Sequence, residues 1–149
     1  MTLFDLCQRF VGEVHERPGD LQSPFIQWCH ESVGLSPDTA DEVPWCSSFL
    51  NRLCWLLRLP RSKSARARSW LLVGRTMPLF EAQVGDVVIL RRGGSTEGPD
   101  VIEAPGHVGV FAGMDASRAV LHVLGGNQSD GVTVVPFKIQ DVLGIRRLT

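Results

Sequence analysis

A cysteine at position 46 and a histidine at position 107 could together carry out nucleophilic chemistry in this chain. Cys46 follows a turn that begins at Pro44 and lies in the first turn of a helix expected from Trp45 to about Leu57. Unpaired backbone N–H groups and the positive end of a helix dipole stabilise a thiolate, the nucleophilic form of cysteine. Buried inert cysteines are common, so the position of Cys46 alone also fits a structural role.

His107 opens an expected strand within the run Gly106-His107-Val108-Gly109-Val110. A lone histidine at a strand edge is more often a surface residue or a hydrogen-bonded core residue than a catalyst. Together with a cysteine at a helix start, however, an imidazole can act as the general base that activates the thiol. The two residues therefore form a candidate nucleophile and base.

Cys46 and His107 belong to two of four segments that stand out together. The segments are Asp41-Glu42-Val43-Pro44-Trp45-Cys46, Gln83-Val84-Gly85-Asp86-Val87-Val88, Gly106-His107-Val108-Gly109-Val110 and Leu124-Gly125-Gly126-Asn127-Gln128. They resemble motifs of the cell-wall cysteine hydrolases of the NlpC-type and CHAP superfamily, and all four occur in the order of that family, with the cysteine before a helix and the histidine on a strand. The resemblance covers the chain from about Asp41 to the C-terminus, and the first forty residues match only as a helical preface.

The resemblance implies a papain-like fold and hydrolysis of an amide in peptidoglycan, either in its peptides or between peptide and glycan. The thiolate of Cys46 would attack the carbonyl, and His107 would protonate the leaving amine and then activate water. The backbone N–H of Cys46, at a helix start, is a candidate donor to the oxyanion. No cofactor and no metal are expected in this chemistry.

A third polar residue is expected to orient His107, and two candidates follow from the two branches of the family. Asn127 matches the CHAP-type spacing, and an amide oxygen can accept from the imidazole N–H without adding a second titrating group. His122 matches the NlpC-type histidine on the next strand. Strand alternation does not decide whether His122 lies on the same face of the sheet as His107, because a register slip of one residue would move it to the other face. We predict Asn127. The chain departs from the CHAP pattern at Gly125, where a glutamate would stand, and Gly125-Gly126-Asn127 also fits a simple turn.

The pattern of apolar residues predicts helices first and strands afterwards, which is an α+β order in one domain over residues 1–149. Helices are expected at Thr2–His15, from a cap at Ser23 to Gly34, at Trp45–Leu57 and at Ser64–Val73, the last with Arg66 and Arg68 on a solvated face. About five antiparallel strands are expected, at Val87–Leu90, His107–Ala112, Ala119–Leu124, Val132–Val135 and Val142–Ile145.

Composition narrows the classes of partner. The chain has 149 residues and a formal net charge of -1, which argues against a nucleic-acid binder, and it has no run long enough to insert into a membrane. The spacing of its cysteines does not indicate a zinc site, and Cys7 and Cys54 lie in apolar segments where a thiol acts as a small hydrophobe.

No signal peptide is visible, so a wall hydrolase made in the cytoplasm would reach the periplasm or wall by phage lysis or dedicated secretion. Secretion as an antibacterial toxin would make an immunity protein the expected partner beside peptidoglycan. Two further hypotheses use the same fold. One is an acyltransferase or another amide hydrolase, and the other is a non-catalytic phage structural or binding module.

Overall fold

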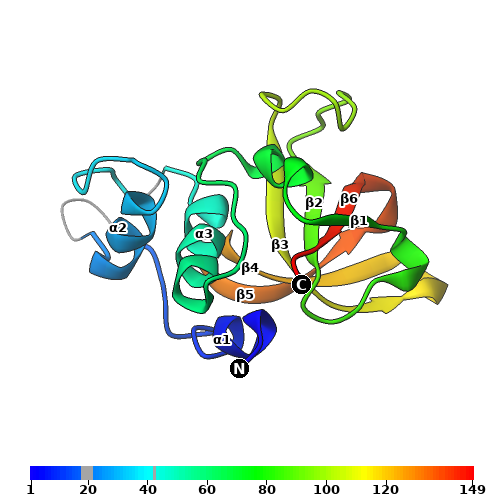
Figure 1. Cartoon of the computed structure of the whole chain (residues 1–149), viewed down its shortest axis with the longest axis horizontal. Helices are drawn as coiled ribbons and strands as arrows, with labels where there is room; N and C mark the ends of the chain where they lie inside the picture. Colours follow the sequence, from blue (N-terminus) through cyan, green and yellow to red (C-terminus); the bar gives the residue numbers. More distant parts are fainter. Residues whose placement is uncertain (18–21, 42) are drawn as a thin grey trace.

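The computed structural model describes residues 1–17, 22–41 and 43–149. Helices occupy the first half of this described chain and an antiparallel sheet occupies the second, which confirms the predicted α+β order (Figure 1). The helices are α1 (Leu3–Gln8), α2 (Pro24–Glu31) and α3 (Cys46–Leu57), with a 3₁₀ helix η1 (Ala67–Leu72). The strands are β1 (Arg75–Met77), β2 (Val87–Arg91), β3 (Gly106–Asp115), β4 (Val120–Gln128), β5 (Gly131–Lys138) and β6 (Val142–Arg147).

The first helix begins as predicted but is shorter. The Thr2 hydroxyl accepts from the Asp5 N–H (3.1 Å) and the Asp5 carboxylate accepts from the Thr2 N–H (2.8 Å), which is a capping box. The prediction of a helix to His15 is wrong because the chain leaves the helix to join the sheet. Gly12 takes a left-handed φ of 78°, and His15 forms a bridge with Gly131 at the start of β5.

Two helix starts are confirmed within one residue. Ser23 caps α2, with Pro24 as its first residue, and α3 begins at Cys46. Helix α3 stands between α2 and the sheet (Figure 1), and Phe49, Leu50 and Leu53 on it are at most 1% exposed. Burial of each such side chain contributes about 1.5–3 kcal/mol, so the helix that carries Cys46 is firmly anchored.

The sheet has the strand order β1-β6-β2-β3-β4-β5, and all neighbours are antiparallel. The five predicted strands are confirmed, whereas the three-residue β1 is too short to show in the sequence pattern. One face of the sheet packs against the helices through Val108, Val110 and Leu124. The other face holds a second apolar cluster that includes Phe111 and Val123. Successive side chains of β3 point to opposite faces of the sheet, so this strand contributes to both apolar clusters.

The prediction that Arg68 is solvated is wrong. Residues 67–72 form a 3₁₀ helix, and the Arg68 side chain is completely buried. Its guanidinium donates to the backbone carbonyls of residues 97, 98, 101 and 105 and to the Ser95 hydroxyl. Arg68 therefore fixes the backbone of the segment between β2 and β3. His107 is the second residue of β3, directly after this segment.

Candidate active site

Cys46 is the first residue of α3 and is 3% exposed. The first N–H of this helix with a partner inside it is that of Phe49, which donates to the Trp45 carbonyl (2.9 Å). No side chain of the described residues caps this end. The N–H groups that precede Phe49 in the helix are therefore available to a ligand, and the helix dipole places positive potential beside the thiol.

His107 lies in β3 against Cys46 and is 5% exposed. Burial alone would raise the pKa of the Cys46 thiol, but the hydrogen bond and the positive charge of His107 outweigh it, so this pKa lies below its ordinary value. The Val108 N–H and Arg92 act in the same direction. Burial likewise opposes the charged form of His107, yet its contact with the Cys46 thiolate raises the pKa of the imidazole. The structure thus brings together the predicted nucleophile and base, and their contact favours the thiolate of Cys46 and the imidazolium of His107.

The third member of this group is Gln128, at the end of β4. Its Oε1 lies 2.8 Å from Nε2 of His107, and its side chain is 5% exposed. The ring of His107 also stacks on Phe137, with centroids 5.3 Å apart and planes inclined by 25°. The amide and the aromatic ring together restrict the imidazole in both position and tilt.

The hydrogen bonds of Gln128 fix the tautomer of His107. The Gln128 amide nitrogen donates to the carbonyls of Val123 (3.1 Å) and Thr133 (2.9 Å), which can only accept. Oε1 must therefore face the imidazole, and Nε2 of His107 must donate to it. Nδ1 is left as the nitrogen that exchanges a proton with Cys46.

The structure does not place Asn127 against His107, so the predicted contact is corrected to Gln128. Alternation along β4 would put residue 127 on the face of Val123, which is also the face of His107. The pairing of β4 with β5 shifts between Gly125 and Gln128, however, and Asn127 has a left-handed φ of 58°. This bulge moves Gln128 into the place that Asn127 would have taken. Gln128 had no separate signal in the sequence beyond its place in the last motif.

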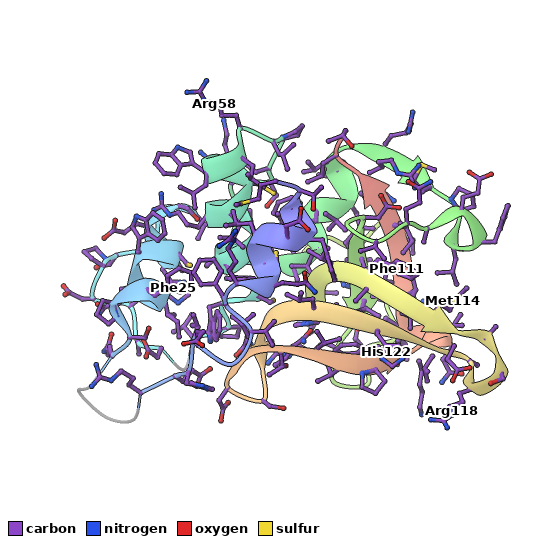
Figure 2. The ribbon with its side chains drawn as sticks, turned by 90° about the horizontal axis from the view of Figure 1, so that it is seen from below. Phe25, Arg58, Phe111, Met114, Arg118 and His122 are labelled. Carbon is purple, nitrogen blue, oxygen red and sulfur yellow. The ribbon has the colours of Figure 1, made fainter. Side chains whose placement is uncertain are left out.

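His122 lies away from Cys46 and His107. It pairs with Gly113, and a register shift between Phe111 and Gly113 puts Phe111 opposite Val123. His107 then shares the face of Val123, and His122 points to the opposite face. Figure 2 shows His122 toward the same end of the sheet as Met114 and Arg118. The alternative orienting role of His122 is thus not supported by the register.

We expect the alkylation of Cys46 by iodoacetamide to reach half its maximal rate below pH 9.0, the ordinary thiol value. Alkylation requires the thiolate, and a lowered pKa keeps the thiolate present at lower pH. In His107→Ala the effect of burial on the pKa of the Cys46 thiol is no longer offset by the imidazole, so the midpoint of the alkylation rate should move to higher pH. Mass spectrometry of quenched samples across a pH series measures this. A midpoint that is insensitive to His107 would contradict the thiolate–imidazolium pair. Cys54→Ala is the matched control, because burial raises the pKa of that thiol to about 12.

Gly125 leaves room for the Gln128 side chain. A Cβ at residue 125 would lie 2.9 Å from Oε1 of Gln128. In Gly125→Ala we expect the amide to be displaced from His107, the imidazolium to lose an acceptor, and alkylation of Cys46 at pH 7 to slow about tenfold. Gly98→Ala is the control, since its Cβ would meet the exposed Asp100 side chain at 3.1 Å. Equal alkylation rates in both variants would refute the role of the Gln128 contact.

Two clefts near His107 share Arg92 and Gly93 in their walls, and Cys46 itself lines neither of them. The His107 cleft has a volume of about 380 Å³, and its walls include His107, Asn127 and Phe137. The Pro44 cleft has a volume of about 410 Å³, and its walls include Pro44 and Pro105. The volume of each cleft falls in the range of sites that hold small ligands, and an extended ligand could reach from one cleft to the other along Arg92 and Gly93.

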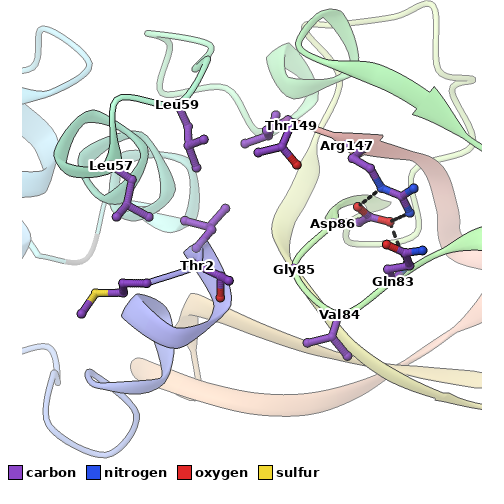
Figure 3. A pocket seen from close by; sticks show the side chains of 12 residues that line it. Thr2, Leu57, Leu59, Gln83, Val84, Gly85, Asp86, Arg147 and Thr149 are labelled. Atoms are coloured by element: carbon purple, nitrogen blue, oxygen red, sulfur yellow. Dashed lines mark hydrogen bonds and ion pairs between the residues drawn. The ribbon is translucent and has the colours of Figure 1, made fainter.

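A third cavity, of about 340 Å³, lies at the opposite end of α3 between α1 and the C-terminus (Figure 3). Leu57 in its wall is roughly 16 Å along the helix axis from Cys46, at 1.5 Å per residue. The cavity is lined by no cysteine or histidine of the described chain. Asp86 and Arg147, which form an ion pair (2.8 Å), are part of its wall. Asp86, which belongs to one of the four motifs, therefore joins β2 to β6.

Asp41, in the first of the four motifs, has a structural contact. It is fully buried, and its carboxylate accepts from the backbone N–H groups of Ser23 (2.6 Å) and Arg17 (3.1 Å). It thus ties the start of α2 to the segment that leads into Cys46. Glu42, which follows it in the same motif, lies outside the described residues.

His30 is a second buried histidine. Its Nδ1 lies 2.9 Å from the Ser48 hydroxyl, and burial lowers its pKa while Asp41 acts weakly in the opposite direction. Cys7, Cys29 and Cys54 are fully buried, and burial raises the pKa of each thiol. Across residues 1–17, 22–41 and 43–149 no group of three metal-ligating side chains comes together.

The helices of the described chain are all too short or too polar to cross a membrane. A scan against models of known protein families, a search of curated proteins and a search of solved structures each gave no match for this chain.

Proposed function

We propose that this protein is a cysteine hydrolase of papain-like fold that cleaves an amide bond in the peptide part of peptidoglycan. The observation that carries the proposal is the relay of contacts from Gln128 through His107 to Cys46 at the uncapped start of α3. A helix-borne cysteine packed on an antiparallel sheet that carries the histidine also supports the papain-like assignment. The four ordered motifs in the sequence support the wall peptide as the substrate class.

Acylation would begin with attack of the Cys46 thiolate on the carbonyl carbon of the amide. The carbonyl oxygen becomes an oxyanion, which the N–H groups at the start of α3 can stabilise. The imidazolium of His107 then gives its Nδ1 proton to the amide nitrogen, the C–N bond breaks, and the amine leaves. The product is a thioester on Cys46.

Deacylation would use water as the second nucleophile. Nδ1 of the now neutral His107 accepts a proton from water while the water oxygen bonds to the thioester carbon. The C–S bond then breaks, and the thiolate and imidazolium are restored. Throughout the cycle, the Gln128 oxygen accepts from Nε2 and keeps Nδ1 directed at the sulfur.

A route to the wall by phage lysis or by secretion as a toxin remains part of the proposal, as does an immunity protein in the second case. The size of the His107 and Pro44 clefts fits a short peptide better than a folded protein substrate.

Digestion of purified sacculi tests the function. We expect soluble muropeptides, identified by mass spectrometry, with one new amine and one new carboxylate for each bond cut. Iodoacetamide should stop the release, and a chelator should leave it intact because a thiolate is the nucleophile. Chelator sensitivity with resistance to alkylation would assign the activity to a metalloamidase instead. Transfer to an added amine without hydrolysis would favour the acyltransferase, and binding to sacculi without release would favour the structural module.

A further inference from the structure

Arg92 occupies a position common to both clefts. It follows directly after β2, whose last residue Arg91 pairs with Gly106 beside His107. Arg92 lines the His107 cleft and also the Pro44 cleft, whose wall includes Gly106 directly before His107. The charge of Arg92 acts on both members of that pair, lowering the pKa of each. A ligand that spans the two clefts would pass this guanidinium.

Arg92 also differs from most other arginines of the molecule in what it contacts. Arg68 is saturated by backbone carbonyls, Arg147 is paired with Asp86, and Arg91 donates to the carbonyl of Gln140 (3.2 Å). The Arg92 side chain is exposed, and its guanidinium makes no hydrogen bond or ion pair with any residue that the structure describes.

Two carboxylates share the clefts with Arg92. Asp141 lines the His107 cleft and Glu103 lines the Pro44 cleft, yet neither forms an ion pair with Arg92 in the described chain. Each cleft has two arginines and one of these acids, since Arg91 belongs to the first and Arg66 to the second. Because Arg92 is shared, the two clefts together have three arginines and two acids. Arg91 balances Asp141 and Arg66 balances Glu103, so Arg92 is the surplus positive charge, which favours an anionic ligand.

We propose that Arg92 binds a free carboxylate of the substrate, carried by a residue next to the scissile amide, so that the protein prefers acidic peptides. This inference rests on the proposed function, because it concerns the substrate of the same thiol. A guanidinium presents a planar fork of donors that matches a carboxylate, and such charge-assisted pairs are stronger than neutral hydrogen bonds. The contact would fix the amide over Cys46.

Two small alkylating agents test the subsite without any assumption about the wall. Iodoacetate and iodoacetamide both form a C–S bond with the Cys46 thiolate and release iodide, but only the first carries a carboxylate. The ratio of their rate constants is independent of the thiolate fraction, because both reagents react with the same thiolate. At low ionic strength we expect Arg92→Gln to lower the ratio of iodoacetate to iodoacetamide about tenfold. Arg92→Lys should give an intermediate ratio, since it keeps the charge and loses the fork.

The matched control is Arg118→Gln, which removes an exposed arginine that lines neither cleft. Its ratio should equal that of the unaltered protein. The same ratio in Arg92→Gln and the unaltered protein, with Cys46 labelled by both reagents, would overturn the subsite and leave the proposed hydrolase intact. Failure of both reagents to label Cys46 in the unaltered protein would overturn the reactive thiol and the subsite together.

Hydrolysis gives a second measurement. Muropeptides are compared with the same muropeptides after their carboxylates have been converted to amides by carbodiimide and ammonium. Arg92→Gln should raise KM for the free acids and leave KM for the amidated peptides nearly unchanged. An equal loss on both substrates would show that Arg92 does not bind the carboxylate.

Discussion

Replacing Cys46 by alanine is expected to lower the rate of muropeptide release by a factor on the order of 10⁶ while the protein stays folded. In the proposed mechanism the sulfur of Cys46 attacks the amide, and among the described cysteines the other three are fully buried with raised thiol pKa values. The initial rate on sacculi measures the effect, and thermal melting checks the fold. Cys54→Ala is the control. It should release muropeptides at the rate of the unaltered protein, even if the loss of a buried side chain lowers the melting temperature.

His107→Ala should be inactive to a similar degree, and the double variant should be no worse than either single one. Residues that act as one unit lose their joint contribution when either is removed, so the two losses do not add. Residual activity of Cys46→Ala equal to that of the unaltered protein would refute the mechanism. Additive losses would show that the two residues act in separate steps.

The second large effect is expected for Gln128→Ala, with a loss on the order of 10²-fold in kcat. Without Oε1 at 2.8 Å, the imidazole loses the acceptor that fixes its tautomer and direction, and a misplacement of about 1 Å is enough for a loss of this size. Gln128→Glu keeps an acceptor for Nε2 but turns its second oxygen to the carbonyls of Val123 and Thr133, which cannot donate, so it should recover only part of the lost rate. Its negative charge should also raise the pKa of His107, which extends the imidazolium to higher pH in a profile of rate against pH.

Asn127→Ala and His122→Ala are the matched controls for this variant. Asn127 lines the His107 cleft, so its removal should affect substrate binding more than kcat. His122 points to the other face of the sheet and should have no effect on either constant. A loss in kcat confined to Asn127→Ala, with Gln128→Ala unaffected, would restore the assignment made from the sequence.

The elements that support the site were predictable because their signals are local. Ser23 with Pro24 marks the start of α2, and the apolar residues of α3 repeat at helical spacing after Pro44. The β-rich runs between turn residues gave five of the six strands. Since Cys46 and His107 lie at the starts of such elements, both could be chosen from the sequence.

The residue that contacts His107 could not be chosen in this way. Its identity depends on a bulge at residues 125–128, and the sequence Gly-Gly-Asn-Gln fits a turn, a regular strand and a bulge equally well. The register of His122 depends in the same way on a shift near Phe111. Side-chain direction after a bulge is set by tertiary pairing, which single-sequence periodicity does not contain.

Arg68 was unpredictable for another reason. Arginine is rarely buried unless its donors are matched, and its partners here are carbonyls some 30 residues further along the chain. Such partners have no side-chain signature, so the sequence around residue 68 resembles a helix with a solvated basic face.

Those same carbonyl contacts determine how the segment between β2 and β3 can be redesigned. Arg68 donates hydrogen bonds to the main-chain carbonyl oxygens of residues 97, 98, 101 and 105. These oxygens are present whatever side chains the residues carry. Exposed positions such as Thr96, Asp100 and Glu103 can therefore be randomised in a library without loss of the loop's path. The lining of the Pro44 cleft, to which Glu103 belongs, becomes a property that directed evolution can alter while Cys46, His107 and Gln128 stay in place.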